Sequence, residues 1–298
     1  MNKYIKTLDF KVYSTHMWDE NLRMIHDIYT QFEALAIPTV SSSRIKAYRD
    51  VFTSLDEAKN HKRQFTQSLA EKVLHTFVEF AQLQTILKAA RTSNQQEAWK
   101  NQLRKLVSGS GFPTRESKHS AARDYQFECL VAAVSELSGY TIRFDEPDVL
   151  VERDNRLFGI AAKRITSHRK IESNCRKGVR QILKSGIPGI IALDISFALY
   201  PNQCINTNDL RGSLRFVEAA ANTFVADYHK RLEAICRDQL VLGVLVNVQL
   251  PVLNFGHEAG PQLASAIRWT IDPFCNHDDR LLRWILQFAH DCQLGLLG

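Results

Sequence analysis

The stretch EPDVLVERDNRLFGIAAKR, residues 146–164, carries the pattern that decides both the fold and the chemistry of this chain. Its two apolar segments are separated by the polar turn residues RDNR, and this arrangement predicts two strands joined in a hairpin. Because side chains alternate along a strand, Ala161 and Lys163 should share one face of the second strand. Pairing of the strands would bring Asp148, at the start of the first strand, towards Lys163.

The segments around this hairpin complete an α/β pattern. Apolar residues recur at helical spacing before and after it, and short apolar runs between turn residues predict further strands. Helices are expected at 120–138 and 173–185, strands at 141–144, 189–196, 240–250 and 265–271, and a closing helix at 278–292. The order helix, three strands, helix, strand predicts a central mixed β-sheet flanked by helices.

The first part of the chain has a different character. Residues 14–107 show helical periodicity without recognisable chemistry, and residues 106–120 collect Gly, Ser, Pro and charged residues, which is typical of a loop between domains. We therefore expect a helical domain over residues 1–110, which positions substrate or binds a partner. An α/β domain should follow over residues 111–298.

Composition narrows the class of protein. The 298 residues carry 38 Lys and Arg against 32 Asp and Glu, a net charge of +6, which mildly favours polyanionic partners such as nucleic acid. The 6 cysteines are scattered without the paired spacing of a zinc site or the density of a disulfide framework. No uncharged apolar run is long enough to span a membrane. We expect a cytoplasmic protein without a membrane partner.

Three charged residues point to phosphodiester chemistry. Glu128 interrupts an apolar helical stretch, where an ionised group needs a cation, and Asp148 and Lys163 should meet across the hairpin. Carboxylates can bind Mg²⁺ or Mn²⁺, which polarises a phosphate and acidifies water, while a lysine stabilises developing charge. The pattern therefore predicts a metal-dependent nuclease site.

These residues resemble the PD-(D/E)XK nuclease superfamily, which has the restriction-endonuclease-like fold. The similarity covers about residues 115–200, and the family implies Mg²⁺-dependent nucleases that act in restriction, repair, recombination or defence against phage. It implies that Asp148 is the central metal ligand, Glu128 the helix-borne acid and Lys163 the catalytic lysine. Ala162 would offer its backbone carbonyl to the metal, and Gln181 matches a glutamine found in some branches of the superfamily.

Ala161 departs from the family pattern, which usually has Glu or Asp there. Another acid serving the metal, an engineered inactive variant and a natural loss of activity are three explanations that stay open. Glu146 and Asp194 are the candidate substitutes. Asp194 is the stronger of the two as a metal ligand, because a carboxylate within an apolar strand needs compensation.

A run of basic residues follows the hairpin. Residues at spacing four on the predicted helix would form a cationic stripe beside the site, and such stripes bind phosphate backbones. The predicted nucleic-acid contacts are Arg164, Arg169, Lys170, Arg176, Lys177, Arg180, Gln181 and Lys184.

These residues are consistent with two main functions. The first is a metal-dependent nuclease, with DNA favoured over RNA as substrate. The second is a catalytically inactive nuclease-fold subunit that binds nucleic acid, a helicase or nuclease partner, or a second copy of itself, and Ala161 is its best support. An interaction protein without a nucleic-acid role is the third, less favoured possibility.

Overall fold

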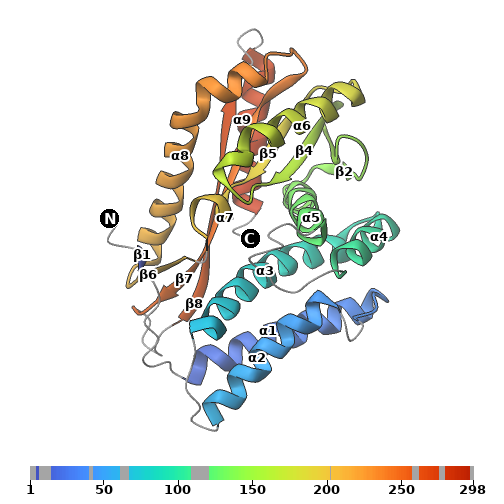
Figure 1. The fold of residues 1–298 in the computed structure, drawn as a ribbon. Coiled ribbons are helices and arrows are strands. Elements are labelled where there is room, and N and C mark those ends of the chain that lie inside the picture. Colours follow the sequence, from blue (N-terminus) through green and yellow to red (C-terminus); the bar gives the residue numbers. More distant parts are fainter. Residues whose placement is uncertain are drawn as a thin grey trace.

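The computed structural model of the chain is shown in Figure 1. It describes residues 5–6, 15–39, 43–60, 67–108, 121–201, 203–256, 262–274 and 279–295. Within these ranges the chain is an α/β protein in which helices precede and then flank a mixed sheet, as the sequence predicts.

The hairpin lies at the centre of the α/β part. Strands β2 (Thr141–Arg143), β3 (Val149–Arg153) and β4 (Arg156–Arg164) pair antiparallel in succession. Asp154 and Asn155 form the turn between β3 and β4 with φ of 53° and 58°. Two consecutive residues in the left-handed region are typical of a tight hairpin turn, and Asp and Asn tolerate that conformation. The hairpin predicted from RDNR is therefore confirmed.

The sheet continues from β4 with parallel strands. β5 (Gly189–Asp194) pairs parallel with β4, and β7 (Val241–Asn254) pairs parallel with β5. The C-terminal end of β7 pairs parallel with β6 (Cys204–Thr207), and β6 pairs antiparallel with β1 (Ile5–Lys6). β8 (Gln262–Pro273) runs antiparallel to β7 along its other edge. The strands expected at 189–196, 240–250 and 265–271 are therefore present.

Helices cover both faces of the sheet because its buried strands are apolar on both sides. Ile190 and Ala192 of β5 pack in one core cluster with α5 (Ala121–Leu137) and α9 (Asp279–Gly295). Ile191 and Leu193 pack in the other cluster with α6 (Ile171–Ser185) and α8 (Leu210–Ile235). α6 ends at Ser185, and Gly186, with φ of 68°, caps it in the left-handed conformation that glycine adopts readily.

Two short helices connect these layers. The 3-10 helix η1 (His168–Lys170) joins β4 to α6, and α7 (Ser196–Leu199) follows β5 directly. Both lie at the carboxyl ends of parallel strands, where ligands bind in many α/β proteins.

Four helices precede the sheet: α1 (Thr15–Ala34), α2 (Arg44–Asn60), α3 (Gln67–Thr92) and α4 (Gln96–Leu106). α3 lies between α5 and the pair α1 and α2, whereas α4 contacts α5 directly (Figure 1). The apolar cluster around α5 continues into these helices, and Trp99 Nε1 on α4 donates a hydrogen bond of 2.8 Å to Glu136 on α5. The domain boundary near residue 110 stays a prediction, since residues 109–120 lie outside the described part.

Candidate active site

Asp148 is the centre of the candidate site. It lies directly before β3, and its Oδ2 accepts hydrogen bonds from Lys163 Nζ at 2.7 Å and from the backbone N–H of Ala162 at 2.8 Å. Its Oδ1 accepts a hydrogen bond from Gln181 Nε2 on α6 at 2.8 Å. The hairpin therefore brings Asp148 and Lys163 together, and Gln181 joins them from the helix that covers this part of the sheet.

The close approach of the chain before β3 depends on Gly159. A Cβ atom at this position would lie 2.6 Å from Cδ of Pro147, which is closer than two carbon atoms of different residues can approach without a clash. Gln181 Nε2 also donates a hydrogen bond of 2.6 Å to the carbonyl of Pro147. Glycine on β4 and glutamine on α6 thus fix the backbone that carries Asp148.

Asp148 and Lys163 are both mostly buried, with side chains 13% and 14% exposed. Burial raises the pKa of Asp148 above its usual value, and the Lys163 ammonium and the donated hydrogen bonds offset this effect only in part. The Lys163 ammonium also donates a hydrogen bond of 2.8 Å to the carbonyl of Ala162. In this arrangement the Lys163 ammonium neutralises the Asp148 carboxylate and is hydrogen-bonded to the Ala162 carbonyl, which the sequence predicts as a metal ligand.

Glu128, on α5, is a partly buried carboxyl group near this pair. Its pKa is raised to about 7, first by burial and then by the negative charge of Asp148, while Lys163 lowers it. Among the described residues Glu128 has no hydrogen-bond or ion-pair partner. A carboxyl group in this position would be stabilised in its ionised form by a bound cation.

Ala161 is fully buried in the apolar cluster beneath α6 and α8, together with Ile165 and Ile191. A carboxylate at this position would be surrounded by apolar side chains next to the candidate site. The methyl group of Ala161 therefore occupies a fully buried, apolar position.

The basic residues predicted on α6 do form an exposed surface. Lys177, Arg180 and Lys184 line a pocket of about 330 Å³ together with Glu146, Lys163 and Gln181. Lys184 pairs with Glu146 at 3.3 Å, and Arg176 pairs with Glu172 at 3.8 Å, both in exposed positions. Arg169 and Lys170 are exposed on η1. The pocket therefore joins the Asp148–Lys163 pair to the cationic surface of α6.

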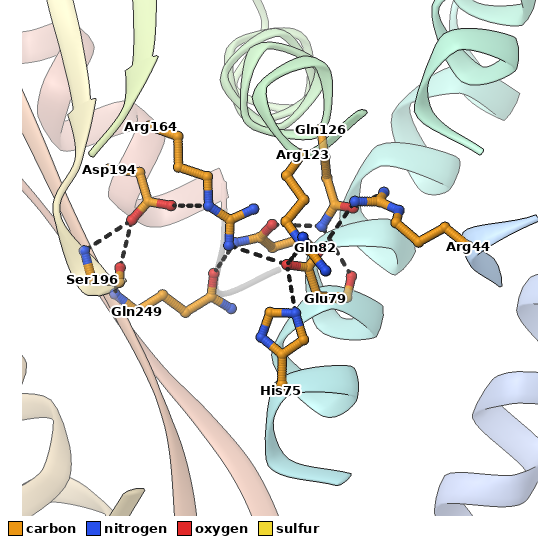
Figure 2. A network of polar contacts seen from close by, with 10 residues as sticks. All are labelled: Arg44, His75, Glu79, Gln82, Arg123, Gln126, Arg164, Asp194, Ser196 and Gln249. Carbon is orange, nitrogen blue, oxygen red and sulfur yellow. Dashed lines mark hydrogen bonds and ion pairs between the residues drawn. The ribbon is translucent and has the colours of Figure 1, made fainter. Parts of the chain in front are cut away.

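The structure places Arg164 and Asp194 in a different setting. Arg164 is 11% exposed, and its guanidinium pairs with Asp194 at 3.5 Å and with Glu79 at 3.1 Å (Figure 2). Asp194 Oδ1 also accepts hydrogen bonds from the backbone N–H and the hydroxyl of Ser196 at 3.1 and 2.6 Å. Arg164 therefore does not lie with the exposed cations of α6, and Arg164 and Ser196 supply the compensation that a carboxylate in an apolar strand requires.

Glu79, on α3, is the centre of a buried polar network that sequence reasoning missed. Besides Arg164, its carboxylate pairs with Arg44 at 3.4 Å, Arg123 at 3.5 Å and His75 at 3.5 Å (Figure 2). The nearby arginines hold the pKa of Glu79 well below its usual value despite its burial. Burial lowers the pKa of His75 to about 3, so this imidazole is neutral at pH 7.

Glutamines extend the same network into the sheet. Gln126 Nε2 donates a hydrogen bond to Gln82 at 2.6 Å, and Gln82 Nε2 donates one to Gln249 on β7 at 2.8 Å. The backbone N–H of Gln249 donates to the Ser196 hydroxyl at 2.8 Å. The network thus connects the N-terminal helices to β4, β5 and β7. Its contact on β4 is Arg164, the residue that follows Lys163.

The metal ligands predicted from the sequence are only partly assembled. No group of three or more His, Cys, Asp or Glu side chains within the described ranges is placed to hold a metal ion. Oxygen donors near Lys163 include the carboxylates of Asp148 and Glu128 and the carbonyl of Ala162, whereas Glu146, at the rim of the same pocket, pairs with Lys184. Such hard oxygen donors suit Mg²⁺, which retains several water ligands.

Comparison with models of protein families, with curated proteins and with solved structures found no match to this chain. Across the described part of the chain, no helix has both the length and the apolar character needed to cross a membrane.

Proposed function

We propose that this chain is a Mg²⁺-dependent nuclease that hydrolyses phosphodiester bonds in DNA, in the manner of the PD-(D/E)XK nucleases that it resembles. The observation that carries the proposal is the 2.7 Å contact between Asp148 and Lys163 beside a pocket lined by Lys177, Arg180 and Lys184. A carboxylate, an ammonium and a cationic surface are the three parts that cleavage of a polyanion requires. A role in restriction or antiphage defence rests on the resemblance alone.

The donor set fits a divalent metal through Asp148 and Glu128. Glu128 has no hydrogen-bond or ion-pair partner among the described residues, and its pKa is raised first by burial and then by the negative charge of Asp148, so a dication would relieve both costs. When bound, the ion would polarise the phosphate and acidify a water molecule. We leave Asp194 out of the ligand set because Arg164 and Ser196 already engage its carboxylate.

Lys163, Gln181 and the cations of α6 then act on the substrate or on the other site residues. Lys163 would transfer its ammonium contact from Asp148 to a phosphate oxygen, where it stabilises the charge that develops during cleavage. Gln181 would keep Asp148 oriented through its 2.8 Å hydrogen bond. The cations of α6 would bind the phosphates on either side of the scissile bond.

A cleavage assay with a panel of substrates tests the proposal. Supercoiled, linear and single-stranded DNA and RNA are incubated with Mg²⁺ or Mn²⁺, and Lys163→Met is compared with the parent chain. We expect DNA cleavage that requires the metal and that falls by about 10²- to 10³-fold in Lys163→Met. Cleavage of RNA alone, or full activity of Lys163→Met, would refute the assignment.

The buried Ala161 favours a second candidate function, a nuclease-fold subunit that binds nucleic acid or a partner without cutting. This candidate predicts salt-sensitive DNA binding by the parent chain with no cleavage under any metal condition. The variant Ala161→Glu separates the two possibilities. Cleavage by Ala161→Glu alone would identify the alanine as the cause of inactivity, whereas cleavage by the parent would exclude the second candidate.

A further inference from the structure

A groove of about 210 Å³ lies between η1, the end of α7 and α8. Four aromatic residues line it, Tyr200, Phe216, Phe224 and Tyr228, and His168 and Asp227 also contribute to its walls. Because η1 and α7 follow β4 and β5 directly, the groove opens at the same end of the parallel strands as Lys163. It is distinct from the pocket beneath α6 that contains Lys163.

The aromatic rings are arranged in two pairs. Phe224 and Tyr228 stack with ring centroids 4.6 Å apart and planes 19° apart, and Tyr200 and Phe216 lie 5.5 Å apart. Phe216 and Phe224 are buried, whereas Tyr200 and Tyr228 are partly exposed. Part of each tyrosine ring is therefore accessible to a ligand, while Phe224 stacks on the Tyr228 ring and Phe216 packs against Tyr200. The volume is below the range of about 300–1,000 Å³ typical of drug-sized ligands, and it suits one flat ring system.

The charges around the groove match a nucleotide. Arg169 and Lys170 are exposed on η1, next to His168 in the groove wall, and they precede the cationic surface of α6. The guanidinium of Arg231 lies 5.7 Å from the ring centre of Tyr228. Asp227 repels phosphate, but its carboxylate accepts hydrogen bonds from the amino and imino groups of a base edge. Cations beside an aromatic groove are the combination that binds single strands.

We propose that this groove binds one unpaired nucleobase of the substrate strand, stacked against Tyr228 and Tyr200, while Arg169 and Lys170 bind its phosphates. The inference rests on the proposed function and narrows its substrate class to DNA with a single-stranded segment or an unpaired end. A base that is paired and stacked within a duplex cannot enter the groove without being extruded.

Binding measurements in EDTA, which prevents cleavage, test the proposal. Fluorescence anisotropy compares a labelled single-stranded oligonucleotide with a duplex of the same sequence, for the parent and for Tyr228→Ala. We expect the variant to bind the single strand about tenfold more weakly, since stacking on one aromatic ring contributes on this order. Duplex affinity should stay within about twofold of the parent, because the duplex contacts the cations rather than the rings.

Two control variants isolate the ring. Tyr29→Ala removes a tyrosine on α1 whose ring centre also lies near an arginine guanidinium, that of Arg49 at 4.9 Å, and it should leave both affinities unchanged. Tyr228→Phe loses the 3.4 Å hydrogen bond to His168 but keeps the stacking surface, and it should bind the single strand as the parent does.

A measurement on the unaltered chain guards against loss of folding in the variants. An oligonucleotide with 5-iodouracil in place of thymine is cross-linked by ultraviolet light, and the modified peptides are identified by mass spectrometry. Cross-links to Tyr228 or Tyr200 support the proposal, and cross-links confined to other segments overturn it.

The failure of this inference is distinguishable from failure of the proposed function. If Tyr228→Ala binds the single strand as tightly as the parent, the groove is not a base site, although metal-dependent cleavage would still support the nuclease. If the parent binds neither form of DNA at low salt, the groove proposal and the nuclease proposal both fail.

Discussion

At the scale of the residue, Glu128 is the most informative side chain. The sequence showed that a carboxyl group in an apolar helical stretch needs a cation, and the structure places it near Asp148 and Lys163 with a pKa raised to about 7. The sequence alone could not show that Asp194, in a similarly apolar stretch, already pairs with Arg164. Glu128 and Asp194 therefore differ in the neighbours, distant in the sequence, that the fold places beside each carboxylate.

The raised pKa of Glu128 makes a prediction about stability. Because its folded pKa lies above the unfolded value of about 4.3, the folded chain binds more protons between these values, and stability falls as the pH rises from about 4.3 to 7. Glu128→Gln should therefore be more stable than the parent by roughly 1–3 kcal/mol at pH 8 without metal, and equal to it at pH 4. Urea denaturation at both pH values measures the difference.

Glu146→Gln is a suitable control, since Glu146 lies at the rim of the Lys163 pocket and pairs with Lys184 in an exposed position. It should change stability by less than about 0.5 kcal/mol at either pH. A Glu128→Gln chain whose stability follows the parent at every pH would show that the carboxyl group is not desolvated as the structure indicates.

At the scale of the element, α6 contacts Asp148 through Gln181 and carries the exposed cations next to the Asp148–Lys163 pair. Its buried side, with Ile171, Cys175 and Ile182, packs on the sheet, while Arg180 and Lys184 face the solvent. This division follows directly from the helical periodicity, so the sequence could predict the cationic surface. Arg164 shows the limit of such reasoning. It belongs to the same basic run, but it is the last residue of β4, and its mostly buried guanidinium pairs with Glu79 of the distant helix α3.

The cationic surface of α6 predicts a salt-dependent affinity. The triple variant Arg176→Ala, Arg180→Ala, Lys184→Ala should bind DNA more weakly and flatten the slope of log K against log salt by up to about 2.7, or roughly 0.9 for each lost phosphate contact. Titrations at several salt concentrations measure this slope.

A second triple variant separates local contacts from total charge. It removes three cations on α3 and α4, with the changes Lys88→Ala, Arg91→Ala and Arg104→Ala. These residues are exposed, so this variant has the same net charge but an intact α6. Equal weakening by both triple variants would contradict a binding surface on α6.

At the scale of the whole molecule, the Glu79 network joins the N-terminal helices to the sheet (Figure 2). It connects α2, α3 and α5 to β4, next to Lys163, and the glutamine contacts reach β7. Local periodicity predicted the order of helices and strands from α5 to β5, and then β7, β8 and α9, but it did not predict β6 or α8, which lie between β5 and β7 in the chain. The network could not be predicted, because the arginines that pair with Glu79 lie 35 to 85 residues from it in the chain and no local pattern marks such pairs.

Glu79 should be critical for stability. Glu79→Ala leaves Arg44, Arg123 and Arg164 buried without their shared carboxylate, and breaking a buried ion pair in this way costs roughly 3–5 kcal/mol. Urea denaturation measures the loss, and Glu57→Ala on the exposed surface of α2 is the control, with a change below about 0.5 kcal/mol. A small effect of Glu79→Ala would mean that the network does not hold the helices to the sheet.

We propose above that Asp148 and Lys163 form a working metal-dependent nuclease site. The most direct measurement is the initial rate of plasmid DNA cleavage with Mg²⁺ for the parent, for Asp148→Asn and for Asp145→Asn, an exposed acid in the same segment. We expect cleavage by the parent and by Asp145→Asn, and a loss of about 10²-fold or more in Asp148→Asn. No cleavage by the parent, or equal rates for Asp148→Asn and the parent, would contradict it.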